Sequence, residues 1–203
     1  MLNTRSPWIY LLISFLFMQK GFSLETSTRY FSKYLGINDG LPSRNISGIT
    51  QDKKGIIWIG SRDMGLIRFD GHKFSTRFED PSIPVINDNN EVFDIITSKN
   101  GNLMIAGSDG IIIFNPDSGH KKTIFKNQKI SALFKDYKGN IWFSIFNKLF
   151  YSEDDSMNKI QLMVTHSTEI SSIMEDPQKR IWYFDIYGRC NKLKSRINES
   201  LRG

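Results

Sequence analysis

Hydrophobic and polar positions follow one another along this chain in a pattern that is repeated four times. Each unit begins with two apolar residues three positions apart: Ile46 and Ile49, Val92 and Ile95, Ile130 and Leu133, and Ile170 and Ile173. A polar turn follows, and then a short apolar segment whose marker residue is Trp58, Met104, Trp142 or Trp182, at spacings of 46, 38 and 40. The residues six positions before these markers are Asp52, Ser98, Asp136 and Asp176. Four coinciding registers indicate an internal repeat of about 40 residues.

Each unit predicts short antiparallel strands joined by tight turns. Asp or Ser opens the first turn by bonding the backbone two residues on, and Gly55, Gly101 or Gly139 supplies a positive φ at its end. The fourth unit has Lys179 at this position, so we expect its turn to be less favourable or of another type. Third and outer strands are predicted at residues 66–70 and 73–78 in the first unit, and at 111–115 and 121–125 in the second.

Four short strands in about 40 residues are typical of a β-propeller blade. Helical solenoids with similar periods need i, i+3, i+4 apolar stripes, which the chain lacks. The fold class expected is therefore all-β, with about four four-stranded blades near residues 36–80, 81–126, 127–165 and 166–203. We expect an open arc, because residues 194–203 show no alternating pattern for a closing strand. Bare blade faces at its ends would favour self-association.

One stretch of the first unit resembles a known family. The residues are Asp39 to Asn45 (DGLPSRN), Ile49 to Asp52 (ITQD), Gly55 to Gly60 (GIIWIG) and Gly65 to Gly71 (GLIRFDG). They are similar to the two-component regulator propeller repeat, which forms the periplasmic sensor of hybrid two-component systems. The second unit departs from that repeat by having Met104 for the tryptophan, and the third and fourth lose the Gly-Ser after the second strand.

This resemblance implies a non-catalytic ligand-sensing segment with an oligosaccharide as the expected ligand. No kinase, receiver or DNA-binding segment follows the repeats in this sequence, so we also expect a truncated part of such a sensor. A structural fragment with no function of its own is an alternative reading. A periplasmic propeller lyase or hydrolase is another, because the fold alone does not exclude an enzyme. Against catalysis, the chain has no Gly-x-Ser-x-Gly elbow and no glycine-rich phosphate loop.

The amino terminus predicts export. Arg5 precedes an 11-residue apolar run at positions 8–18, and small residues at Gly21 and Ser23 suit cleavage before Leu24. Residues 1–23 are therefore interpreted as a signal peptide, and residues 24–203 as a periplasmic repeat region. An uncleaved anchor or a buried strand is the alternative for this run. No second long apolar stretch follows, so no membrane span is expected in the mature chain.

Charge and cysteine content limit the classes of partner and cofactor that we expect. The net charge is +6, and removal of residues 1–23 takes away Arg5 and Lys20 and no acid, which leaves +4. The remaining basic residues are scattered, so nucleic acid is not expected as a partner. A single cysteine, Cys190, and three widely spaced histidines favour neither a disulfide nor a metal site, and no cofactor is expected.

Strand alternation predicts where the core residues and the ligand-binding residues lie. The markers Trp58, Met104, Trp142 and Trp182 are expected in the core between blades. Loops that enter the first strand and join the second to the third should gather on one side, where rigid scaffolds usually carry function. Ordinary polar loops remain the alternative. The ligand-binding residues expected on that side are Arg44, Asn45, Arg62, Asp63, Asp109, Asn147, Asp185 and Tyr187.

Overall fold

The computed structural model describes residues 32–86 and 91–193, and residues 35–193 contain all of its sheets. It is an all-β fold, as predicted, in which a short 3-10 helix, η1 (Ile37–Asp39), precedes fifteen strands. The proposed signal peptide at residues 1–23 lies outside the described residues. Within the described ranges, no helix has the length and hydropathy needed to cross a membrane.

The strands form four antiparallel sheets, and in each sheet the spatial order follows the chain order. The first sheet contains β1 (Ile46–Gln51), β2 (Ile57–Ser61), β3 (Gly65–Phe69) and β4 (Phe74–Ser75). The second contains β5 (Asp94–Thr97), β6 (Leu103–Gly107), β7 (Gly110–Phe114) and β8 (Lys121–Ile124). The third contains β9 (Ile130–Lys135), β10 (Ile141–Ile145), β11 (Lys148–Ser152) and β12 (Ile160–Thr165). The fourth contains β13 (Ile170–Glu175), β14 (Ile181–Asp185) and β15 (Cys190–Lys192).

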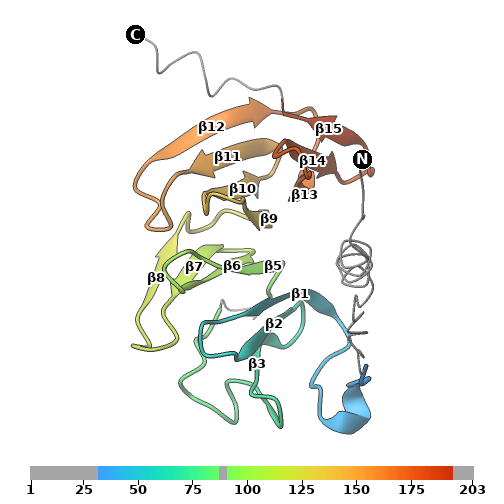
Figure 1. Ribbon diagram of the computed structural model, residues 1–203, viewed down its shortest axis with the longest axis vertical. Helices are drawn as coiled ribbons and strands as arrows, with labels where there is room; N and C mark the ends of the chain where they lie inside the picture. The colour runs from blue at the N-terminus through green and yellow to red at the C-terminus, as the bar shows by residue number, and fades with distance from the viewer. Residues whose placement is uncertain (1–31, 87–90, 194–203) are drawn as a thin grey trace, which may run out of the picture. The chain divides into compact units, whose positions relative to one another are not determined.

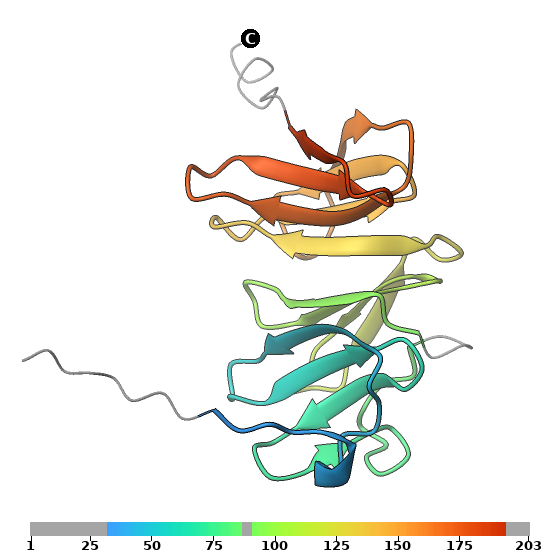
Figure 2. The same ribbon diagram turned by 90° about the vertical axis from the view of Figure 1, so that its right-hand side faces the viewer.

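These sheets are the predicted blades, stacked in chain order (Figure 1). Their first strands, β1, β5, β9 and β13, lie beside one another in succession, as the inner strands of a propeller do (Figure 2). In both views the first and last sheets lie at opposite ends of the stack, so the blades of residues 35–193 form an open arc. Two details differ from expectation. Strand β4 has only two residues, and the fourth sheet has three strands within the described part of the chain.

The hydrophobic core lies in three layers between neighbouring sheets. Trp58 packs against residues of the second sheet, and Met104 packs against residues of the third. Trp142 packs against residues of the fourth sheet. These three marker residues are 4%, 0% and 1% exposed, which confirms the predicted core role. Trp182 differs: it is only half-buried, because no sheet of the described residues follows β13–β15 to cover it.

The opposite end of the stack is covered by the chain itself. Ile59, Ile67 and Phe74 form the outer layer of the first sheet, and partly buried Leu35 and Leu41 pack against them. The segment before β1 therefore covers the first sheet's outer face, whereas the outer face of the fourth sheet stays open to solvent at Met174, which is 42% exposed.

A hydrogen-bonded pair accounts for the six-residue spacing seen in the sequence. Asp52 Oδ1 accepts bonds from the N–H groups of Lys54 and Ile56, at 2.9 and 3.0 Å, which organises the turn. Its Oδ2 accepts a bond from Trp58 Nε1 at 2.8 Å. The same indole bond joins Trp142 to Asp136 at 3.1 Å. The carboxylate therefore both organises the hairpin turn and binds the tryptophan of the next strand.

The fourth blade repeats this bond, and the second blade replaces it. Trp182 Nε1 donates to Asp176 Oδ2 at 2.8 Å. The second blade has Ser98 and Met104 in the two positions, and the buried Ser98 hydroxyl has no hydrogen-bond partner within the described residues. Where the indole donor is lost, its acceptor is lost as well.

The fourth turn is of the same type as the others, which leaves the first of the two expected alternatives, a less favourable turn. Lys179 N donates to Asp176 O at 2.9 Å, as Gly55 N does to Asp52 O at 3.1 Å. Lys179 adopts φ 65°, beside 83°, 91° and 88° at the equivalent glycines. A left-handed backbone is unfavourable for a residue with a Cβ, so the fourth turn is the less favourable one, as predicted.

Candidate functional site

Antiparallel pairing sorts the connections of each blade to two sides. One side, which we call the loop face, contains the segments that precede the inner strands and the turns that join the second strand to the third. Its backbone is closed by bonds such as Arg62 N to Asn45 O at 3.1 Å and Ile186 N to Glu169 O at 3.0 Å. We call the opposite side, with the turns at residues 52–55, 98–101, 136–139 and 176–179, the turn face. The eight predicted ligand-binding residues all lie on the loop face.

In the first blade, the carboxylate of Asp63 ties two segments together. Asp63 Oδ1 accepts bonds from Ser43 Oγ at 2.6 Å and from Ser61 Oγ at 2.5 Å. These bonds, that from Ser43 first, lower the pKa of Asp63. The neighbouring side chains of Arg44 and Asn45 are exposed. Asp63 therefore positions this loop, and Arg44, Asn45, Arg62 and Asp63 itself are all exposed to solvent.

Two cations meet one aromatic ring above the inner strands. Arg62 Cζ lies 5.0 Å and Lys129 Nζ lies 5.6 Å from the ring centroid of Phe93. Lys129 Nζ is also 2.7 Å from Glu169 Oε1, which accepts a further bond from Ser131 Oγ at 2.5 Å. Burial raises the pKa of Glu169, but the bonds from Lys129 and Ser131 outweigh burial and lower it. This row connects all four blades.

Asp109 and Asn147 hold the loops of the second and third blades. Asp109 Oδ1 accepts a bond from Asn127 N at 2.5 Å. Asn147 Nδ2 donates to His166 O at 2.7 Å, and His166 N donates to Asn147 O at 2.7 Å. Asp109 bonds the segment that leads into β9, and Asn147 bonds the segment between β12 and β13, so the structure gives both residues a positioning role.

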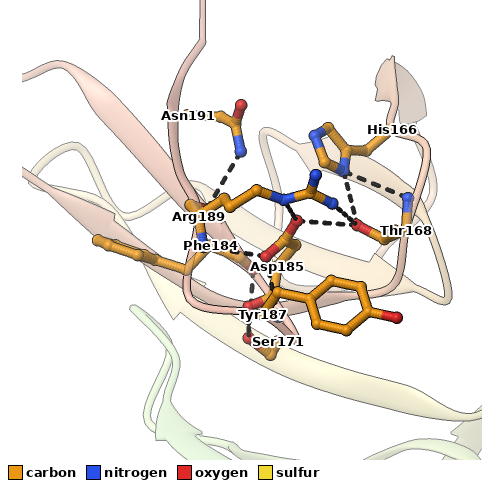
Figure 3. Close-up of polar contacts among 8 residues, drawn as sticks. All are labelled: His166, Thr168, Ser171, Phe184, Asp185, Tyr187, Arg189 and Asn191. Carbon is orange, nitrogen blue, oxygen red and sulfur yellow. Dashed lines mark hydrogen bonds and ion pairs between the residues drawn. The ribbon is translucent and has the colours of Figure 1, made fainter.

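The fourth blade has the densest polar network, centred on Asp185 (Figure 3). Asp185 Oδ1 accepts bonds from the N–H groups of Tyr187 and Arg189 at 2.9 and 3.0 Å. Asp185 Oδ2 accepts bonds from Arg189 Nε at 2.6 Å and from Thr168 Oγ1 at 2.9 Å. Burial raises the pKa of Asp185, but these bonds outweigh burial and hold its pKa at about 2. At neutral pH the group is a carboxylate with all its bonds within the blade.

This network holds an exposed aromatic ring in place. Tyr187 is 71% exposed, and Arg189 Cζ lies 5.4 Å from the centroid of its ring. Its hydroxyl points away from the network (Figure 3). Arg189 is fixed in turn by Asp185 and by Thr168 Oγ1 at 3.3 Å. A flat ring beside a fixed guanidinium can stack on a sugar ring and donate hydrogen bonds to its hydroxyl groups.

The sequence missed several members of this face, including Phe93, Lys129, Ser131, Thr168, Glu169 and Arg189. A signal for Arg189 was present, because Asp185 to Arg189 repeats the spacing of Asp176 to Arg180, an i, i+4 pair that also forms an ion pair, at 2.5 Å. The structure brings Asp185 and Tyr187 into one turn. It distributes the other predicted residues over the loops of the first three blades. In the described ranges, no group of three or more His, Cys, Asp or Glu side chains is placed to bind a metal ion.

Comparisons with known proteins agree with this architecture. Residues 40–63 match the family described as "Two component regulator propeller". Histidine kinase P4 of Formosa agariphila is 35% identical over 77 residues, which are 38% of this chain and 6% of the kinase. The chain therefore spans a small part of the curated relative that it matches.

Solved propellers share the fold. The extracellular domain of one hybrid two component system of Bacteroides thetaiotaomicron matches with a TM-score of 0.63 and 20% identity over 85% of this chain. A second such domain from this bacterium matches with a TM-score of 0.62 and 22% identity over 83% of this chain. The matched region is 24% of each domain. Virginiamycin B lyase of Staphylococcus aureus matches with a TM-score of 0.54 and 17% identity, over 76% of this chain and 57% of the lyase.

The repeat match and the structural likeness refer to the same blades. Residues 40–63 include the first Asp–Trp pair, Asp52 and Trp58, and their hairpin. The third and fourth blades repeat that pair at Asp136 and Asp176. Residues 40–63 therefore match the two component regulator propeller repeat, and the chain shares its propeller fold with extracellular domains of hybrid two component systems.

Proposed function

We propose that this chain is a non-catalytic segment of a periplasmic sensor propeller, and that its loop face binds a glycan fragment. The observation that carries the proposal is the exposed Tyr187 ring, held beside Arg189 by the Asp185 network. Aromatic rings with a hydrogen-bonding edge are suited to sugars, which present apolar faces and hydroxyl rims. The amino-terminal apolar run and the likeness to extracellular sensor domains support a periplasmic location.

The proposal places this chain in a larger assembly. The matched region is 24% of the sensor domains and 6% of the kinase, so we propose that it corresponds to one part of such a receptor, with kinase and regulator functions in other domains. A lyase or hydrolase is the alternative, since a lyase shares the fold. The network argues against Asp185 as a general acid, because a carboxyl group with a pKa of about 2 holds no proton to donate at neutral pH.

Calorimetry of the full chain against a panel of neutral and acidic oligosaccharides tests this function. We expect Tyr187→Ala to weaken binding of a responding glycan at least tenfold, or about 1.4 kcal/mol, because it removes the stacking surface. For a neutral glycan, Tyr137→Ala is the matched control, since Tyr137 is 57% exposed on the turn face. Unchanged affinity in Tyr187→Ala would contradict loop-face binding. Cleaved or unsaturated products in the same mixtures would contradict a non-catalytic role.

A further inference from the structure

A cavity lies on the turn face, between the third and fourth blades. Its volume is 360 Å³, within the roughly 300–1,000 Å³ of small-molecule sites. Its apolar part is formed by Trp142, Tyr151, Ile181 and Leu193. Three lysines, Lys138, Lys179 and Lys192, are among its lining residues; Arg180 is as well, although its guanidinium bonds Asp176 and lies beside the Trp182 ring. An apolar floor with several cations suits an organic anion better than a neutral ligand.

Two of these cations meet an exposed aromatic ring. Lys179 Nζ lies 4.6 Å and Lys138 Nζ lies 5.6 Å from the ring centroid of Tyr137. Tyr137 is 57% exposed and belongs to the lining of the cavity. Two ammonium groups that approach one ring repel each other, and an anion placed between them would relieve this repulsion.

The carboxylates near the cavity already have partners. Asp136 accepts bonds from Asn140 and Trp142, and Glu175 Oε2 accepts a bond from Tyr137 N at 3.0 Å. Asp176, just outside the lining, pairs with Arg180 at 2.5 Å. Within residues 32–86 and 91–193, the three lysines of the cavity form no ion pair. The three lysines outnumber the two lining carboxylates, those of Asp136 and Glu175, so the cavity has a net positive charge.

The position of Lys179 is unusual for its residue type. It adopts φ 65° in a turn that the other three blades close with glycine. A residue with a Cβ is unfavourable there, so the fourth blade places an ammonium group at the cavity at the expense of its turn. This backbone outlier is independent of the charge argument and points to the same side chain.

We propose that this turn-face cavity binds a small organic anion with a ring-shaped body, in effect a ring carboxylate. The carboxylate lies between Lys138 and Lys179, and the ring packs against Tyr137 and the apolar floor. The inference does not depend on the loop face, since it uses different residues on the opposite side of the blades.

The test measures binding of glucuronate and benzoate to the full chain by calorimetry, with glucose and inorganic sulfate as controls. The two carboxylates separate a sugar from an aromatic source. We expect at least one to bind with a Kd below about 10 mM, and glucose and sulfate to bind at least tenfold more weakly. Raising the salt concentration should weaken binding, because the cavity is open to solvent.

Lys179→Gly is the decisive variant, because it restores the residue of the other three turns and removes the ammonium group together with its aliphatic stem. We expect at least a tenfold loss of carboxylate affinity with an unchanged or higher Tm. Tyr137→Ala should also weaken binding, whereas Tyr187→Ala and Lys148→Gln, both on loop-face segments, should leave it unchanged. Failure of both carboxylates to bind, full affinity in Lys179→Gly, or equal binding of sulfate would overturn the proposal. None of these results would affect the loop-face test.

Discussion

The tryptophan positions allow the packing between blades to be measured with matched substitutions. Trp142 is 1% exposed, its ring centroid lies 4.7 Å from that of Tyr151, and it packs against the fourth sheet. Truncation of such a side chain removes its buried area and leaves a cavity between two sheets. We expect Trp142→Ala to lower the free energy of unfolding by about 3–5 kcal/mol.

Trp182 is the internal comparison, because it occupies the same strand position and makes the same indole bond to Asp176. It is only half-buried, and Arg180 Cζ lies 5.7 Å from its ring centroid on the open side of the sheet. With less apolar area removed from water and no facing sheet, Trp182→Ala should cost about 1–2 kcal/mol. The difference between the two substitutions measures what a following blade contributes.

Trp142→Phe separates packing from hydrogen bonding. The phenyl ring keeps most of the apolar contact but removes the Nε1 donor from Asp136 Oδ2, which retains the bond from Asn140 Nδ2 at 2.8 Å. Because the carboxylate keeps one partner on this oxygen, we expect a loss of about 1–2 kcal/mol. Asp136→Asn should have a similar effect, and the double variant should cost less than the two single changes added together.

Urea unfolding followed by far-UV circular dichroism is the appropriate assay, since tryptophan fluorescence would itself change. The measurement should be made at a protein concentration where sedimentation shows a monomer. A cost below about 1 kcal/mol for Trp142→Ala would refute the interblade packing described here. Equal costs for Trp142→Ala and Trp182→Ala in the monomer would show that the outer face of β13–β15 is covered, contrary to the open arc.

Four further outcomes are expected. Burial raises the pKa of Asp94 to about 6, above its unfolded value near 4. The free energy of unfolding should therefore fall by up to about 3 kcal/mol as the pH rises from about 4 to 6. Asp94→Asn should flatten this pH profile, measured by urea unfolding. Ser98→Ala should be neutral or slightly stabilising in thermal unfolding, because it removes a buried hydroxyl without a partner among the described residues; a loss above about 1 kcal/mol would reveal an unseen partner. Lys179→Gly should raise the free energy of unfolding by about 1 kcal/mol by relieving a left-handed residue, whereas a decrease would show that its side chain contributes more than its backbone costs. We also expect self-association at high concentration through the outer face of β13–β15, where Met174 is exposed; sedimentation should show Met174→Lys to be monomeric, and a monomeric parent chain would contradict this expectation.

Much of the fold could be predicted because it depends on short-range patterns that recur. The apolar alternation, the turn residues and the six-residue spacing each depend on a few neighbouring positions, and the first three core markers are buried as expected. Trp182 shows the limit of this reasoning. It occupies the same position in the repeat as Trp142, but its exposure depends on whether another sheet follows, and the local sequence pattern does not encode that.

The loop face was harder to predict because the roles of its polar residues depend on partners far along the chain. Asp63 and Asp109 look like ligand-binding groups in the sequence, yet their oxygens bond Ser43 and Asn127. Asp155 is a similar case, since it belongs to an acidic run but is buried and accepts two bonds from Asn100 of the second blade. Side chains that stabilise a loop and side chains that bind a ligand are of the same types, so only the three-dimensional contacts separate them.

The Asp–Trp pairs of the first, third and fourth blades restrict the mutational routes open to this repeat. Loss of the tryptophan alone leaves a carboxylate without its indole donor, and loss of the aspartate alone leaves an indole N–H without its acceptor. A blade that has lost one member of the pair is therefore less stable than a blade with both members or with neither, so we expect the two positions to change together in evolution. The second blade, with Ser98 and Met104, has the composition of a repeat that has completed this double step. Blades without the tryptophan in related sequences should accordingly lack the aspartate six residues before it.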